Sequence, residues 1–355
     1  MKPFNLISRR VPRVSILRPG KTQILTALAA SLLLAAIPSF ARRTSGQLQK
    51  PLAGPRATVL RITPLYVEPD PSSQRVSRVQ IGREMVVAEK SGPWMRVYAN
   101  TDIEEERGPD VPEMQTEETT PPISGWIEAK GVVEETTPGG DQILMGAAAN
   151  EESLAADPRG PANAARSARL LYRRLYEMFP SSPLAPEAAW RAADIEWQLE
   201  KADAASLPSA KEKDPYMHEL MDEDGLKKVI KQYPRTRWAA LAAYDLIDNK
   251  LCGDWQGSAD CPEKEADDYE KYADEYPDGP RTAEALYQAV YRTAVLSNMF
   301  QSNGDNKKAD EAHNQARQLA AQLKQHFADS DYNLRAQALV FKLDQNVPVF
   351  GIDFQ

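Results

Sequence analysis

A frame of residues that recurs four times in the second half of the chain restricts the fold more than any other feature. In each copy an aromatic residue is followed nine positions later by alanine: Phe179 and Ala188, Tyr233 and Ala242, Tyr276 and Ala285, Phe327 and Ala336. Proline directly follows the aromatic residue in the first three copies, and Ala328 replaces it in the fourth. Because one repeat cannot bury its apolar side alone, a repeated unit predicts neighbours that stack on one another.

The residues around each aromatic position have a helical period. Positions seven and four before it are apolar or aromatic in every copy: Tyr172 and Leu175, Leu226 and Val229, Tyr269 and Tyr272, Ala320 and Leu323. Proline ends a first helix because its ring clashes with the preceding turn, and the small alanine lets a second helix approach closely. The frame therefore predicts helical hairpins over residues 162–345, at spacings of 54, 43 and 51 residues.

Residues 57–134 have a different pattern, which is typical of a small β-barrel. Short runs rich in Val, Ile, Tyr and Trp alternate with Pro, Ser and Gly turns. Between two of these runs lies an insertion, residues 99–124, with eight acidic residues against one arginine. Few of its residues are apolar, so we expect it to lack a fold of its own.

The first 41 residues have the pattern of an export signal. Six basic residues precede an apolar run from Ile24 to Ile37, and Ser39 and Ala41 are the small residues that a signal peptidase requires. Retention as an uncleaved inner-membrane anchor is the alternative. We expect residues 42–56 and 135–161 to be linkers and 346–355 to be a C-terminal tail, which either caps the last repeat or binds a partner as a strand. Cleavage would leave a periplasmic or otherwise exported chain with no integral membrane domain.

The charge and the cysteines restrict the function further. Removing residues 1–41 takes away six basic residues and no acid, which leaves 37 basic and 51 acidic residues and a net charge of −14. Such a field repels phosphate backbones, so we expect no nucleic-acid partner. In an exported protein, Cys252 and Cys261 favour a disulfide that closes a loop. A reactive nucleophile or a pair of metal ligands is the alternative for these two residues.

No catalytic pattern stands out. The three histidines, His218, His313 and His326, lie outside any zinc-peptidase or cysteine-hydrolase spacing. No nucleophile elbow, phosphate-binding loop or dinucleotide fingerprint occurs, and the carboxylates are scattered as on solvated surfaces. We therefore expect no catalytic residues, no metal and no cofactor.

Both halves resemble known families. Residues 57–134 resemble the bacterial SH3-like domain in the segments Leu65–Pro69, Gly92–Val97 and Gly125–Ile127, together with Gly131 and Val132. The helical frame resembles tetratricopeptide (TPR)-like repeats. It is most similar to the repeats of periplasmic proteins such as those of outer-membrane assembly and the Tol–Pal coordinator. The resemblance implies a multidomain chain, all-β and then all-α, in which a small SH3-like barrel precedes a TPR-like array. It also implies binding of envelope proteins by the array and of peptides or peptidoglycan by the barrel.

The candidate binding residues are aromatic. In the barrel they are Tyr66, Trp94, Tyr98 and Trp126, with packing as the alternative, above all for the two tryptophans. In the array they are Tyr172, Tyr176, Trp190, Trp238, Tyr244 and Tyr287, which pack between helices in the alternative interpretation. The expected function is that of a non-enzymatic envelope adaptor or scaffold. The alternative is a cell-wall hydrolase, or its regulatory subunit, with an unrecognised active site.

Overall fold

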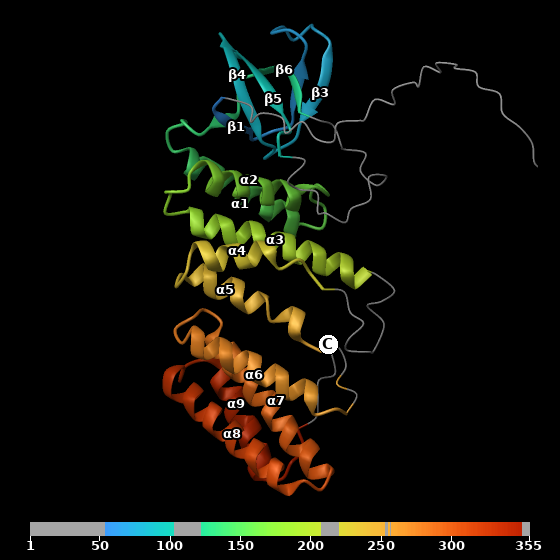
Figure 1. Cartoon of the computed structure of the whole chain (residues 1–355), viewed down its shortest axis with the longest axis vertical. Coiled ribbons are helices and arrows are strands. Elements are labelled where there is room, and N and C mark those ends of the chain that lie inside the picture. The colour runs from blue at the N-terminus through green and yellow to red at the C-terminus, as the bar shows by residue number, and fades with distance from the viewer. Residues whose placement is uncertain (1–53, 103–121, 207–219, 253–254, 256, 350–355) are drawn as a thin grey trace, which may run out of the picture. The chain divides into compact units, whose positions relative to one another are not determined.

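The computed structural model describes residues 54–102, 122–206, 220–252, 255 and 257–349, all of which belong to one compact unit, residues 51–355. In this part of the chain seven strands precede nine α-helices (Figure 1). The predicted export signal, most of the first linker, most of the acidic insertion and the end of the tail lie outside the described residues.

The seven strands form one antiparallel sheet in the order β3-β2-β6-β5-β4-β1-β7. Side chains alternate between its two faces, and one face holds an apolar core that includes Leu65, Met85, Val97 and Ile127. The predicted all-β region is confirmed at this level. The strands are β1 (Arg56–Val59), β2 (Thr63–Tyr66), β3 (Arg75–Val79), β4 (Met85–Ser91), β5 (Trp94–Ala99), β6 (Ile123–Glu128) and β7 (Val132–Glu134).

The helices follow the sheet and pack against their neighbours in the sequence (Figure 1). The predicted array is confirmed as a helical repeat-like arrangement. Its helices are α1 (Gly140–Ala156), α2 (Ala164–Met178), α3 (Ala185–Ser206), α4 (Asp224–Gln232), α5 (Arg237–Asp245), α6 (Asp260–Glu275), α7 (Thr282–Ser302), α8 (Asn306–His326) and α9 (Asp331–Asp344), with a 3-10 turn at Asp248–Lys250.

The repeated frame marks the same points in four helix pairs. Phe179, Tyr233, Tyr276 and Phe327 are the C-terminal caps of α2, α4, α6 and α8, and each donates its backbone N–H to the carbonyl four residues earlier. The four alanines nine residues later are fully buried in the partner helices. The aromatic residue thus ends the first helix of a pair, and the alanine lies where the second helix meets its neighbours.

The second predicted linker is wrong, because most of it forms helix α1. Leu144 and Ala148, four residues apart, are fully buried against α2 and β7. The helix begins at a glycine pair: Gly139 adopts φ +64°, and Gly140 lies so close to the Phe179 ring that a Cβ there would be 2.4 Å from it. The glycines that suggest a linker instead start a helix at a crowded contact.

The sheet and the first helices share one core. Val133 of β7 packs with Leu144 of α1 and Leu171 of α2 in a single cluster. Gly82, in the turn between β3 and β4, has φ +79° and lies against Leu170, where a Cβ would clash at 2.5 Å. The two predicted domains are therefore in direct contact through these residues.

A buried ion network lies at the same junction. The Arg174 side chain of α2 is fully buried, and its Nη1 lies 2.6 Å from Oε2 of Glu84 and 3.0 Å from Oε2 of Glu177. Its Nη2 lies 3.5 Å from Oδ2 of Asp102, whose side chain is also buried. Arg83 approaches the same Asp102 oxygen at 3.7 Å. Charged side chains from the sheet and from α2 thus neutralise one another out of water.

No helix among the described residues combines the length and the apolar composition that a membrane span requires.

Candidate functional site

The four aromatic candidates of the sheet lie on its outer face, opposite the apolar core. In β5, Trp94 and Tyr98 alternate with the core residues Met95 and Val97. In β2, Tyr66 follows the core residue Leu65. In β6, Trp126 precedes the core residue Ile127 and lies opposite Tyr66 of β2. Alternation along three neighbouring strands therefore brings the four aromatic side chains to one surface.

The four rings differ in exposure. Tyr66 and Trp94 are buried and pack edge to face, with ring centroids 5.6 Å apart. Tyr98 and Trp126 are half-buried and have part of their surface in contact with solvent. None of the four belongs to the apolar cluster on the other face of the sheet. The burial of Trp94 against Tyr66 is a packing role, which is the alternative given above for the tryptophans.

Arginines border this outer aromatic face. Arg75 of β3 lies opposite Tyr66, and its guanidinium carbon is 5.8 Å from the centre of the tyrosine ring. Arg96 of β5 lies opposite Trp126 and is exposed. Arg78 lies opposite Pro64 on the same face. These arginines are not apparent from the sequence, because only the strand register reveals that they share a face with the rings.

In the helical array, the first two candidates are parts of helix packing. Tyr172 is fully buried in the core shared with the sheet, and its hydroxyl donates to Glu152 at 2.6 Å. Its ring is therefore out of reach of a partner. Tyr176 packs where two clusters meet, and burial raises its pKa to about 12.

Trp190 and Trp238 come together across α3 and α5. Their rings stack with centroids 5.3 Å apart, and the Trp190 indole N–H donates to Oδ2 of Asp245 at 3.2 Å. Burial, and then the charge of the nearby Asp194, raise the pKa of Asp245 to about 7. Arg237 lies over the Trp238 ring at 4.8 Å. Both tryptophans are half-buried, so this pair presents part of its surface on the array.

Tyr244 and Tyr287 are half-buried at the edge of the largest cluster. Tyr244 packs edge to face against Tyr272 at 5.3 Å, and Arg281 lies over its ring at 5.5 Å. The Tyr287 ring lies 5.7 Å from the Tyr332 ring of α9. The six array candidates therefore spread over several helix contacts and do not converge on one point.

The predicted disulfide is confirmed. Cys252 and Cys261 are bonded, with Cα atoms 5.9 Å apart, and they lie beside a buried ion pair. The Glu265 carboxylate accepts hydrogen bonds from the Cys252 backbone N–H at 2.8 Å and from the Trp255 indole at 3.1 Å. Its other oxygen accepts from Nε of Arg292 at 2.6 Å. This arrangement fixes the cysteine loop on α6 and α7 and serves the structure.

Few of the described side chains are candidates for catalytic residues or metal ligands. The ring Nε2 of His313 lies 2.9 Å from an Asp344 carboxylate oxygen that also accepts from Arg317, an arrangement that joins α8 to the end of α9. His218 lies outside the described residues. Within the described ranges, no three His, Cys, Asp or Glu side chains are grouped in a way that could hold a metal ion.

The described part of the tail, residues 346–349, lies where a cap on the last repeat is expected. Val349 is buried beside the disulfide cluster, and its backbone N–H donates to Oδ1 of Asn298 on α7 at 2.8 Å. A polar hollow of about 170 Å³ lies beneath Val347 and Pro348. The remaining tail residues, 350–355, lie outside the described residues.

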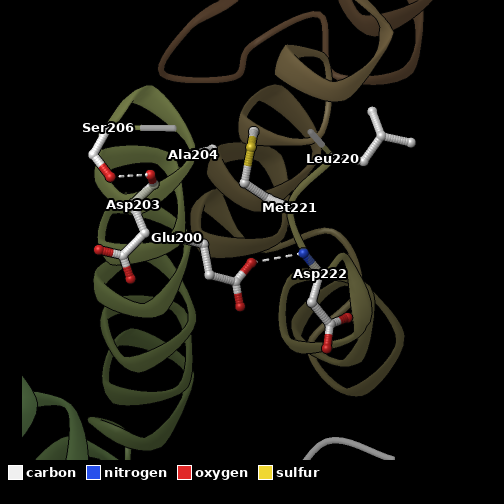
Figure 2. A pocket seen from close by; sticks show the side chains of 7 residues that line it. All are labelled: Glu200, Asp203, Ala204, Ser206, Leu220, Met221 and Asp222. Carbon is white, nitrogen blue, oxygen red and sulfur yellow. Dashed lines mark hydrogen bonds between the residues drawn. The ribbon is translucent and has the colours of Figure 1, made fainter. Parts of the chain in front are cut away.

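A larger hollow of about 530 Å³ lies between the end of α3 and the segment before α4 (Figure 2). A Glu200 carboxylate oxygen accepts the backbone N–H of Asp222 at 2.7 Å across it, which ties the two segments together. Its lining residues Ser206 and Leu220 flank, in the sequence, a segment that lies outside the described residues, and we assign the hollow no ligand.

Comparison with known proteins adds little to this picture. No family model matches the chain, and no curated protein matches it. Among solved structures, the chain is similar to the DHF79 filament and to the de novo designed helical repeat protein DHR64, each at 15% identity and a TM-score of 0.21. The matches cover 56% and 58% of this chain and 95% and 94% of those chains. The description of the array therefore rests on its own helices.

Proposed function

We propose that this protein is an exported, non-enzymatic adaptor of a bacterial cell envelope. In this proposal the strands form an SH3-like barrel that binds a peptide or peptidoglycan, and the TPR-like array binds envelope proteins. The export signal of residues 1–41 would direct the chain to the periplasm, or anchor it in the inner membrane if it is retained. The resemblance to bacterial SH3-like and TPR-like modules supports each part.

The observation that carries the proposal is the outer aromatic face, on which Tyr66, Trp94, Tyr98 and Trp126 are gathered. Partly exposed tyrosine and tryptophan rings offer large, rigid contact areas with a polar edge, which suits binding surfaces. The two half-buried rings, Tyr98 and Trp126, are the ones a ligand would contact.

The experiment is sedimentation of residues 42–355 with purified peptidoglycan. We expect Trp126→Ala and Tyr98→Ala to weaken sedimentation, with circular dichroism showing that both variants remain folded. Phe341→Ala is the matched control, because Phe341 is an aromatic residue of α9 that is 66% exposed and far from the sheet in the sequence. If wild type and both variants sediment to the same extent, the aromatic face is not the wall-binding site.

The array half of the proposal is tested by affinity capture from envelope extract. The bait is the whole mature chain, since a fragment that starts at residue 162 would lose α1 and expose the core of α2. We expect Trp238→Ala to reduce recovery of the captured proteins, with Phe341→Ala again as the control. Release of soluble muropeptides from the wall by the purified chain would instead favour the cell-wall hydrolase.

A further inference from the structure

The outer face of the sheet carries a row of side chains that crosses four strands. Arg75 of β3 lies opposite Tyr66 of β2, Tyr66 lies opposite Trp126 of β6, and Trp126 lies opposite Arg96 of β5. Directly opposed residues of antiparallel strands present their side chains on the same face. The row therefore reads arginine, tyrosine, tryptophan, arginine, with the two cations at its ends.

In the described part of the chain, neither end of the row forms an ion pair. Among the described residues, no carboxylate lies within 4 Å of the guanidinium groups of Arg75, Arg78 or Arg96, although acidic residues outnumber basic ones in the chain. Two described acids share this face: Glu89, opposite Arg96, and Glu128, which pairs with Arg61 at 3.6 Å. Arg75 and Arg96 are both exposed, so their donors are available to a ligand.

The chemistry of the row selects the ligand. We propose that this face binds a peptide that bears free carboxylate groups, with Arg75 and Arg96 as anchors and with the backbone of the peptide over the half-buried Trp126 ring. Guanidinium groups hold carboxylates through paired N–H donors, a geometry that lysine does not offer. Three strand spacings separate the two arginine positions, about 14 Å. That distance corresponds to about four residues of an extended peptide.

Polyanions fit this face less well. The net charge of the chain is −8, and Glu89 and Glu128 lie on the same face as the arginines. A phosphate polymer would bring charge against these acids along its whole length, whereas a peptide with separated carboxylates places charge only at the two ends of the row. The inference rests on the proposed function, since it names the ligand class of the same aromatic face.

The test compares two forms of one probe, a soluble disaccharide-tetrapeptide released from peptidoglycan and the same compound with its carboxylates converted to amides. Isothermal titration calorimetry with residues 42–355 measures the binding of each. We expect amidation to weaken binding about tenfold or more, because hydrogen bonds between charged groups are lost. Arg96→Gln and Arg75→Gln are expected to weaken binding of the free acid by a similar factor and to leave binding of the amide unchanged.

Two further variants sharpen the result. Arg96→Lys keeps the charge but removes the paired donors, and its effect is expected to be intermediate. Arg159→Gln, at an exposed position in the segment that follows α1, is the charge-matched control and is expected to bind like the wild type. Circular dichroism establishes that each variant is folded.

The outcomes separate this inference from the proposed function. If both probes bind equally well, the carboxylate assignment is overturned, while wall binding by the aromatic face stands. If neither probe binds, the assignment is likewise overturned, and sedimentation with whole peptidoglycan decides separately whether the face binds the wall at all.

Discussion

Replacing Arg174 by methionine tests the claim that the sheet and the helices form one cooperative unit. The Arg174 side chain is completely buried and lies within ion-pair distance of Glu84, Glu177 and Asp102. Methionine fills much of the volume but removes the buried cation that these carboxylates share, which leaves Asp102 with Arg83 and Glu84 with the half-exposed Arg56. Breaking a buried ion pair in this way costs about 3–5 kcal/mol. Because domains are stable by only about 5–15 kcal/mol, the variant should lose a large fraction of its stability.

Urea unfolding followed by far-ultraviolet circular dichroism measures this loss. Arg159→Met is the control, since an exposed substitution is expected to change the free energy of unfolding by about 0.5 kcal/mol at most. Glu84→Gln provides a double-mutant cycle. When it is combined with Arg174→Met, the loss in the free energy of unfolding should be smaller than the sum of the two single losses, because both substitutions remove the same ion pair. A loss below about 1 kcal/mol for Arg174→Met, with additive effects, would refute a stabilising role for the network.

Three more predictions concern stability. Replacing Cys252 and Cys261 by alanine opens a ten-residue loop and should lower the free energy of unfolding by about 2–3 kcal/mol, measured by thermal denaturation. Burial raises the pKa of the Asp245 carboxyl to about 7. The folded chain therefore binds the carboxyl proton more tightly than the unfolded chain does. As a result, the contribution of Asp245 to the free energy of unfolding falls as pH rises from about 4 to 7. Asp245→Asn should therefore gain about 3–4 kcal/mol on the wild type between pH 4 and pH 8 in urea denaturation. An equal difference at both pH values would contradict this. Leucine at the buried Ala336 should cost about 1–3 kcal/mol by overpacking, whereas leucine at the exposed Ala338 of the same helix should leave the melting temperature nearly unchanged.

The helix pairs could be predicted from the sequence because their determinants are local and repeated. The aromatic cap, the residues one and two turns before it and the alanine nine residues later all belong to one hairpin, as in Phe179 and Ala188. Helix α1 could not be predicted in the same way. Its glycines and small residues resemble a linker, and its burial depends on Phe179 and Val133, which lie outside the helix.

The outer aromatic face was only half predictable. The sequence points to the four rings, since large aromatic residues stand out in a small β region. Their common face follows from alternation within each strand. The arginines beside them could not be predicted, because the pairing of β2 with β6 joins residues as distant as Tyr66 and Trp126. The same limit applies to the pair of Glu84 and Arg174, which are 90 residues apart.

The shared core would restrict how the proposed adaptor binds two partners. Two binding modules joined by a flexible linker raise each other's effective concentration over a range of geometries, and the range is set by the linker length. Here α1 occupies most of the expected linker, and Val133, Gly82 and Arg174 join the sheet to α2 through apolar contact, close packing and charge. In the proposed adaptor, this junction would limit the separations and orientations that a flexible linker would otherwise allow. Such an adaptor selects partners by geometry as well as by affinity, and weakening the junction would impair simultaneous binding before it impaired either single interaction.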